Sequence, residues 1–144
     1  MLVTQWDCIR FHRNAVSHRN GDAATTARGT DMRVLVVEDE PLLAMMLEES
    51  LADLGHEVIG PAASAEHALS LLTDNPVEAA LLDFSLGSDG NSVPVARQLR
   101  DAGIPFCYLS GHATLDAGTG APDAPLLSKP VSMAALEDAL ARMA

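Results

Sequence analysis

The sequence predicts an α/β fold in which a parallel sheet carries helices on both faces. From residue 33 onward, short apolar runs of strand length alternate with segments whose apolar residues recur at helical spacing. Alternating elements of this length favour parallel strands joined by helical crossovers, with helices packed on both sides of the sheet. A chain of 144 residues is long enough for one compact domain of this kind.

Five apolar segments are the candidate strands. The first reads RVLVVE and is apolar almost without interruption, which is typical of a strand buried on both faces of a sheet. The second and fifth segments are shorter than the other three. The predicted strands cover residues 33–38, 56–60, 78–83, 105–110 and 126–128.

A helix is predicted after each of the five strands. Gly55 ends the first helix and Gly103 the third, while Ser64 and Ser92 are placed to cap the second and third at their N-termini. The helix expected within 111–124 is short or frayed, because that segment holds three glycines and a proline. The last helix begins near Ser132 and is predicted to turn Met133, Leu136, Leu140 and Met143 inward. We also interpret Met45, Met46, Met133 and Met143 as core residues.

Charge and hydropathy narrow the class of protein. The formal net charge is −11, and residues 32–144 hold seventeen acidic against five cationic residues. Such a surface repels phosphate backbones and anionic lipids, so direct DNA binding and membrane binding are disfavoured. No stretch approaches the roughly 20 apolar residues of a membrane span, and the N-terminus lacks an apolar signal core. We expect a cytoplasmic protein.

The chain divides near residue 31. Residues 1–31 show no sustained period and are predicted to be a disordered N-terminal extension, whereas 32–144 form the folded domain. Met32 directly precedes the first strand, which makes it an alternative start of the protein. Cys107 lies in an apolar strand and is interpreted as a buried free thiol.

Residues able to do chemistry stand at the ends of four predicted strands. The carboxyl ends of parallel strands share one edge of the sheet, where ligands bind in such folds. Two carboxylates that meet there repel each other unless a cation lies between them, and Mg²⁺ prefers such oxygen ligands. In strand order, these residues are Glu38 and Asp39, Asp83, Ser110, and Lys129.

Lys129 is the only lysine in the chain. An ammonium that faces a carboxylate cluster suits a phosphoryl oxygen or the nucleophilic carboxylate, and the Ser110 hydroxyl suits a second phosphoryl oxygen. Asp83 is therefore a candidate to form an aspartyl-phosphate, because phosphoryl transfer mainly needs positioning and charge neutralisation. Glu40, in contrast, is interpreted as an acidic residue that favours the start of a helix.

Together these residues resemble the receiver domains of two-component response regulators, over about residues 32–144. Family members have an acidic pair after the first strand, a phosphorylated aspartate after the third, a Ser or Thr after the fourth and a Lys-Pro pair after the fifth. Residues 105–112 also resemble a subgroup of single-domain receivers with the motif Pro-Phe-x-Phe-x-Thr-Gly-Tyr. The matching residues are Glu38 and Asp39, Asp83, Ser110, and Lys129-Pro130, where a cis peptide is usual.

The resemblance implies a doubly wound five-stranded sheet in the flavodoxin-like order 2-1-3-4-5. It implies Mg²⁺ held by Glu38, Asp39, Asp83 and the main-chain carbonyl of Ser85. It also implies a stand-alone regulator, not a dedicated enzyme, that supports its own phosphorylation and dephosphorylation. The phosphoryl donor would be a sensor histidine kinase or a histidine phosphotransfer protein, and the output would be partner binding or phosphorelay.

The family pattern bears on three further positions, and the first departs from it. Leu126 stands where many receivers carry an aromatic residue that turns inward on phosphorylation. Tyr108 lies on the same strand face as Ser110 and is a substitute for that residue, although a buried core tyrosine is the commoner case. His112 occupies the place that influences how fast the phosphoryl group is lost, and a solvated loop histidine is the alternative.

Other functions remain open at this point. A phosphatase of the haloacid dehalogenase type would need a second aspartate at position 85, which is serine. A nucleotide binder would need a glycine-rich phosphate loop, and neither common form is present. A receiver-fold interaction module that is not phosphorylated is the main alternative, because Leu126 already departs from the usual switch.

Overall fold

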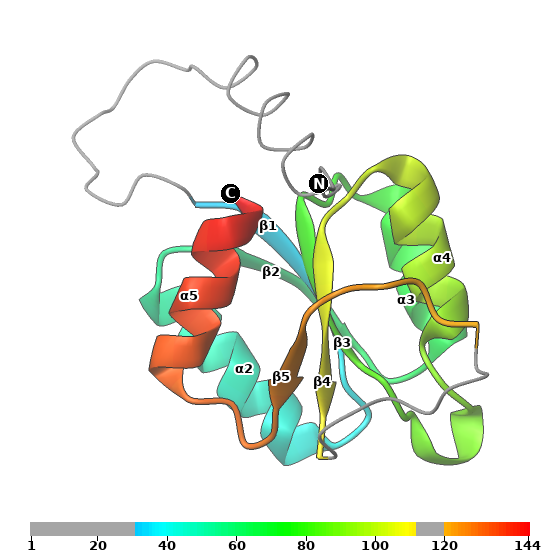
Figure 1. Cartoon of the computed structure of the whole chain (residues 1–144), viewed down its shortest axis with the longest axis horizontal. Coiled ribbons are helices and arrows are strands. Elements are labelled where there is room, and N and C mark those ends of the chain that lie inside the picture. Colours follow the sequence, from blue (N-terminus) through cyan, green and yellow to red (C-terminus); the bar gives the residue numbers. More distant parts are fainter. Residues whose placement is uncertain (1–30, 112–119) are drawn as a thin grey trace.

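Five parallel strands form one sheet in the order β2-β1-β3-β4-β5 in the computed structural model, which describes residues 31–111 and 120–144 (Figure 1). The predicted fold class and strand order are confirmed, and each strand end lies within two residues of its predicted place. The strands are β1 (Arg33–Val37), β2 (Glu57–Ala62), β3 (Ala79–Asp83), β4 (Phe106–Ser110) and β5 (Leu126–Ser128).

Helices cover both faces of the sheet. Figure 1 shows α2 (Pro41–Asp53) and α5 (Met133–Met143) on one side and α3 (Ala65–Asp74) and α4 (Val93–Ala102) on the other. A short 3-10 turn, η2 (Gly87–Asp89), lies between β3 and α4. The helix expected within 111–124 falls mainly on 112–119, outside the described residues, and 120–125 contain no helix. Within the described part of the chain, no helix has the length and apolar character needed to span a membrane.

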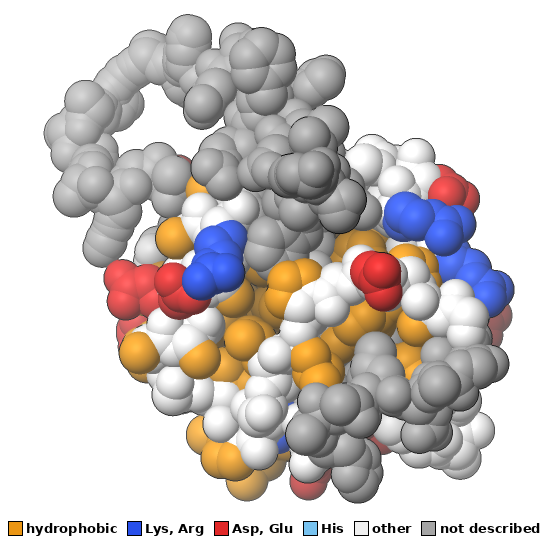
Figure 2. All heavy atoms as spheres, in the orientation of Figure 1, with side chains coloured by type: hydrophobic (Ala, Val, Ile, Leu, Met, Phe, Trp, Pro, Cys, Tyr) orange, Lys and Arg blue, Asp and Glu red, His pale blue; other side chains and the backbone are white. Residues whose placement is uncertain are grey.

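Alternate residues of the central strands pack into two separate hydrophobic cores, one on each face of the sheet. In β1, Val34 and Val36 pack toward α2 and α5, whereas Leu35 and Val37 pack toward α3 and α4. β3 and β4 are buried along their whole length, which explains why these strands read as continuous apolar runs. β5 is only half-buried, and Figure 2 shows hydrophobic side chains at the surface between α5 and α4, where this strand forms the sheet edge.

One of the two predicted serine caps is present. Ser64 has an extended backbone (φ −140°, ψ 160°), and its hydroxyl accepts a hydrogen bond from the His67 N–H at 3.1 Å. The prediction for Ser92 was wrong, because its backbone (φ −93°, ψ 12°) lacks the extended conformation that turns a capping side chain toward the first helical turn. The Asn91 side chain instead accepts from the Val93 N–H at 3.0 Å.

The interpretation of the methionines as core residues was wrong for three of the four. Met45 and Met46 are each 49% exposed and Met133 is 43% exposed, whereas Met143 is buried. The side of α2 that meets the sheet is formed by Ala44, Leu47 and Leu51, which recur at helical spacing. Met133 is the first residue of α5, ahead of the buried residues of that helix, Leu136, Ala139, Leu140 and Met143.

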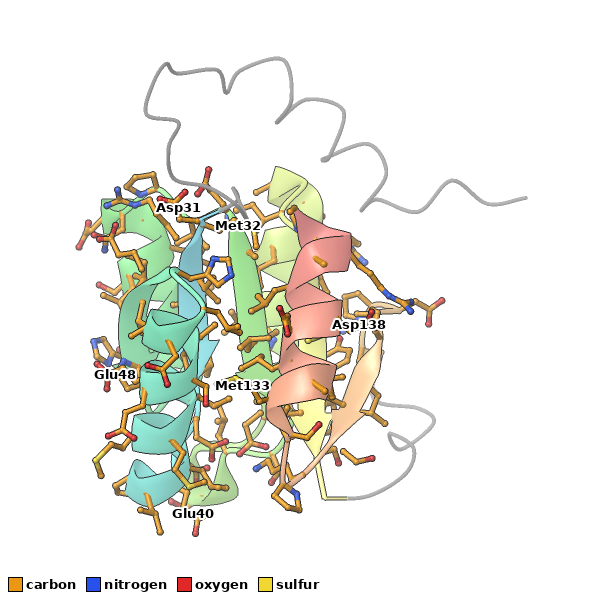
Figure 3. All side chains as sticks on the ribbon, turned by 90° about the vertical axis from the view of Figure 1, so that its left-hand side faces the viewer. Asp31, Met32, Glu40, Glu48, Met133 and Asp138 are labelled. Carbon is orange, nitrogen blue, oxygen red and sulfur yellow. The ribbon has the colours of Figure 1, made fainter. Side chains whose placement is uncertain are left out.

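The two ends of the sheet carry different parts of the chain. Figure 3 shows Asp31 and Met32, which precede β1, at one end of the molecule and Glu40, which follows β1, at the other. Because all five strands are parallel, the residues that follow the other strands also gather at the end marked by Glu40.

Candidate functional site

Glu38, Asp83 and Lys129 meet at the carboxyl ends of β1, β3 and β5. Val37 pairs with Leu82 in the sheet, so Glu38 and Asp83 follow at neighbouring positions. The Lys129 Nζ lies 3.0 Å from Asp83 Oδ2 and 3.3 Å from Glu38 Oε1. The structure thus brings together residues that are 91 positions apart at their extremes in the sequence, from 38 to 129.

This cluster is buried, and burial changes its protonation. Glu38 is 3% exposed and Asp83 is 5% exposed. Burial, together with the hydrogen bond and negative charge of Asp83, raises the pKa of Glu38 to about 7. Burial alone would lower the pKa of Lys129, but the hydrogen bonds and charges of Asp83 and Glu38 outweigh it and raise that pKa. Two buried carboxylates share one ammonium group, so Glu38 keeps its proton to a higher pH than a free carboxyl group would.

The acidic residues form a donor set that fits Mg²⁺. One carboxylate oxygen from each of Glu38, Asp39 and Asp83 lies within 4.8 Å of the others. Hard oxygen donors at this separation suit a magnesium ion, which keeps several waters and needs only one or two direct carboxylates. Asp39 is half-buried, unlike its two neighbours, so it forms the solvent side of the group. The raised pKa of Glu38 agrees with this fit, because it marks a place where a positive charge would be favourable.

Of the two predicted serines, Ser110 contacts the backbone of Lys129, and Ser85 follows the strand that carries Asp83. Ser110 is the last residue of β4, is 7% exposed, and its carbonyl accepts a hydrogen bond from the Lys129 N–H at 2.9 Å. Ser85 lies two residues after Asp83, is exposed, and forms an isolated antiparallel bridge with Asn91. His112 lies outside the described residues.

Tyr108 is a core residue. It is fully buried, its hydroxyl donates to the Pro122 carbonyl at 2.8 Å, and its ring makes edge-to-face contacts with Phe84 and Phe106. Leu126 pairs with Tyr108 in the sheet and is half-buried. The tyrosine thus fixes residues 120–125 to the strand that ends in the site.

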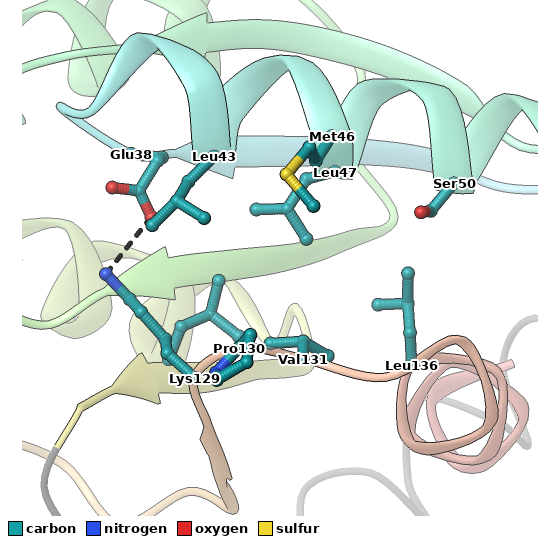
Figure 4. A pocket seen from close by; sticks show the side chains of 10 residues that line it. Glu38, Leu43, Met46, Leu47, Ser50, Lys129, Pro130, Val131 and Leu136 are labelled. Carbon is teal, nitrogen blue, oxygen red and sulfur yellow. Dashed lines mark ion pairs between the residues drawn. The ribbon is translucent and has the colours of Figure 1, made fainter.

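Two features near the cluster were missed by sequence reasoning. The first is a groove between α2 and the segment that joins β5 to α5, where the Lys129–Pro130 peptide is cis, as the resemblance implied (Figure 4). The methionines of α2 are the signal in the sequence that could have indicated this groove, but we assigned them to the core. The second is Gly87, whose backbone approaches Asp39 and whose positive φ is not visible in the sequence. The groove is lined by Glu38, Leu43, Met46, Leu47, Ser50, Leu109, Lys129, Pro130, Val131 and Leu136.

Comparison with known proteins gives a consistent result. Residues 34–141 match the family described as the response regulator receiver domain. The chain is 37% identical over 111 residues to the transcriptional regulatory protein PrrA of Mycobacterium tuberculosis, an alignment that covers 74% of this chain and 47% of that protein. The chain therefore spans about half the length of the curated relative it matches.

Solved structures with a similar fold include a chain of about the same size as this domain and a regulator about twice as long. SdrG from Sphingomonas melonis Fr1 has a TM-score of 0.68 at 36% identity, over 78% of this chain and 96% of that chain. The response regulator PhyR from Brucella abortus has a TM-score of 0.68 at 28% identity, over 79% of this chain and 48% of that chain.

Proposed function

Because this chain belongs to the response regulator receiver domain family, we propose that it accepts a phosphoryl group on Asp83 in a Mg²⁺-dependent reaction. The observation that carries the proposal is the buried contact between Asp83 and Lys129, 3.0 Å apart, beside the acidic pair Glu38 and Asp39. A phosphoacceptor needs a carboxylate nucleophile with positive charge close by, and this arrangement supplies both.

Each residue has a defined role in this proposal. An Asp83 carboxylate oxygen attacks the phosphorus of a phosphohistidine, the P–N bond breaks, and the imidazole leaves with the electron pair. The Lys129 ammonium and the Ser110 hydroxyl donate hydrogen bonds to phosphoryl oxygens. Glu38, Asp39, Asp83 and the Ser85 carbonyl hold Mg²⁺, which supplies positive charge to the transferred group. Hydrolysis of the aspartyl-phosphate by water restores the carboxylate, so the cycle is regulatory and the protein is not a dedicated enzyme.

The groove beside α2 supports a protein phosphodonor. Its wall includes Lys129, which contacts Asp83, so a partner seated there lies next to the phosphoacceptor (Figure 4). Four large hydrophobic side chains are exposed in the described residues, three in the first two turns of α2 and one at the start of α5, and Met46 is the one of them that lines the groove. We assign this face to a sensor histidine kinase or a histidine phosphotransfer protein. The exposed hydrophobic residues are Leu42, Met45, Met46 and Met133.

Phosphotransfer from a panel of histidine kinases tests the central claim. We expect label to move to the wild type and not to Asp83→Ala, and to require Mg²⁺. Beryllofluoride with Mg²⁺ should change the amide NMR spectrum of the wild type and leave that of Asp83→Asn unchanged. A change of equal size in both proteins would reject Asp83 as the acceptor.

The donor surface has a separate test. Met46→Glu should slow transfer from a cognate kinase about tenfold, because a charge is placed in an apolar contact, while phosphorylation by acetyl phosphate stays unchanged. The matched control is Gln98→Glu. Gln98 is exposed and belongs to α4, which lies on the opposite face of the sheet from α2, so this substitution should change neither rate. Equal slowing with both donors would place the effect in the site and not in docking.

An interaction module that is not phosphorylated is the second candidate. The half-buried Leu126, in place of the aromatic residue of many receivers, is the observation that favours it. Such a module would show no beryllofluoride response in the wild type and no label from any donor. In both cases we propose a cytoplasmic protein that signals through a protein partner and does not bind DNA directly, in line with its net charge of −11. Only the phosphorylated receiver could also act in a phosphorelay.

A further inference from the structure

The loop between β3 and α4 is tied to itself by backbone hydrogen bonds. The Leu86 N–H donates to the Gly90 carbonyl at 2.8 Å, and the Gly90 N–H donates to the Gly87 carbonyl at 3.1 Å. The Ser92 N–H donates to the Phe84 carbonyl at 3.0 Å and closes the base of the loop. Leu86 is 1% exposed and anchors the loop in the core on the α3 and α4 side. Such a loop has little freedom to move as a unit.

Gly87 is the point at which this loop approaches the acidic cluster. Its φ is +63°, and a Cβ built on its backbone would lie 3.1 Å from Asp39 Oδ2. That separation is shorter than ordinary contact between carbon and oxygen atoms. A side chain at this position would therefore require either the loop or the carboxylate to shift by a few tenths of an ångström.

The carboxylate is the group that would yield. The loop is fixed by its three backbone bonds and by Leu86, whereas Asp39 is half-buried and lies in the short segment between β1 and α2. One of the carboxylate oxygens of Asp39 belongs to the group of three within 4.8 Å of one another. Mg²⁺ demands nearly ideal octahedral geometry, so a small displacement of one donor weakens binding more than it would for a larger, more adaptable cation.

We propose that Gly87 is a positioning residue for the metal site, because only its missing side chain leaves Asp39 free to face Glu38 and Asp83. This inference rests on the proposed Mg²⁺ site and adds that the β3–α4 loop, through the size of residue 87, sets the affinity of that site. It also predicts that bulk at 87 acts on the metal without touching the phosphoacceptor.

Gly90 offers a matched control in the same loop. It has a φ of +91° and a ψ of −128°, a conformation that glycine adopts far more readily than other residues, so a substitution there also strains the backbone, but a Cβ on it would meet nothing within 4 Å. Mg²⁺ affinity of Gly87→Ala and Gly90→Ala can be measured by calorimetry on the unphosphorylated protein. We expect Gly87→Ala to weaken binding about tenfold, as changes beside metal ligands commonly do, and Gly90→Ala to change it less than about twofold.

The outcomes separate this inference from the function it rests on. Wild-type protein that binds no Mg²⁺ would overturn both. Wild-type binding with an unchanged Gly87→Ala affinity, or with equal losses in the two variants, would overturn the role of Gly87 and leave the metal site standing. If Gly87→Ala does not fold, Gly87→Asn replaces it, because asparagine tolerates positive φ better than alanine.

A double-mutant cycle distinguishes an effect of Gly87 on Asp39 from an effect of loop strain alone. In an Asp39→Ala background the carboxylate that Gly87 accommodates is absent, so Gly87→Ala should cause no further loss of Mg²⁺ affinity. A second tenfold loss in that background would show that the glycine acts through the loop and not through Asp39.

Discussion

The two ends of the sheet treat charge in opposite ways. At the end that precedes the strands, Arg33 pairs with Glu57 at 3.6 Å, and both side chains are well exposed, at 39% and 59%. Backbone groups there also find partners, since the Arg33 N–H donates to Glu78 Oε1 at 2.9 Å. At the end that follows the strands, Glu38 and Asp83 are almost fully buried and share the ammonium of Lys129.

This difference distinguishes exposed charges on the surface of the fold from buried charges in a candidate functional site. Exposed ion pairs cost little and contribute little, whereas two acids buried side by side destabilise the chain that holds them. The pKa of Glu38, raised to about 7, records that cost. Perturbed groups of this kind concentrate at functional sites, where a ligand supplies the missing charge.

Removing the lysine should have the largest effect. Lys129→Met leaves Glu38 and Asp83 buried without their ammonium, and we expect the free energy of unfolding at about pH 8 to fall by about 2–3 kcal/mol. Urea denaturation of the metal-free protein measures this, and Mg²⁺ should restore part of the loss. A decrease below about 0.5 kcal/mol would mean that the buried end is no more dependent on its cation than a surface pair is.

Measuring stability as a function of pH tests the same buried end of the sheet through the proton on Glu38. Because the pKa of Glu38 is raised from 4.5 to about 7, the folded state holds a proton that the unfolded state releases. This stabilisation is fully present below pH 4.5 and is lost as the pH rises through about 7. Without metal, the free energy of unfolding should therefore decrease by on the order of 2 kcal/mol between about pH 5 and pH 8.

Two controls isolate that proton. Glu38→Gln cannot ionise and should remove this part of the pH dependence, and saturating Mg²⁺ should flatten the wild-type curve by favouring the carboxylate. A wild-type curve that rises over the same range in the absence of metal would contradict the assignment to Glu38.

The sequence predicted the sheet better than the surfaces. β1, β3 and β4 are buried on both faces, so their apolar runs carried a strong signal, and parallel strands force their carboxyl ends to one edge. That geometry was enough to predict from the sequence that Asp83 and Lys129 lie close together. The outward direction of Met45 and Met46 could not be predicted in the same way, because α2 is apolar on more than one side and only packing decides which side is buried.

Local backbone conformation was the other limit. Ser64 and Ser92 are the same residue type before similar helices, yet only Ser64 has the extended conformation that allows its side chain to cap. The role proposed for Gly87 depends on a positive φ and on an approach to a residue 48 positions earlier, from 87 to 39. Neither property follows from the amino acid alone.

Tyr108 tests whether burial by itself creates the cost seen at the site. Its hydroxyl is buried but hydrogen-bonded to Pro122, so Tyr108→Phe should lose about 1 kcal/mol of stability and leave Mg²⁺ affinity unchanged. Burial, and then the charge of Asp123, raise the pKa of this tyrosine to about 12. It is the only tyrosine, so absorbance near 295 nm should report ionisation near pH 12 directly. Ionisation near its usual value of about 10 would show that the hydroxyl is not held in the core.

Arg33→Met should have the smallest effect and supplies the counterpart to Lys129→Met. The Arg33–Glu57 pair is exposed, and Glu78 contacts the backbone N–H of residue 33, which the substitution keeps. Arg33 Nε is also buried without a hydrogen-bond partner among the described residues, so its removal relieves a small cost. We expect a change within about 0.5 kcal/mol by the same urea measurement. Equal losses from Arg33→Met and Lys129→Met would contradict the distinction between the two ends. That distinction requires that only Lys129 stabilises acids that have little access to bulk water.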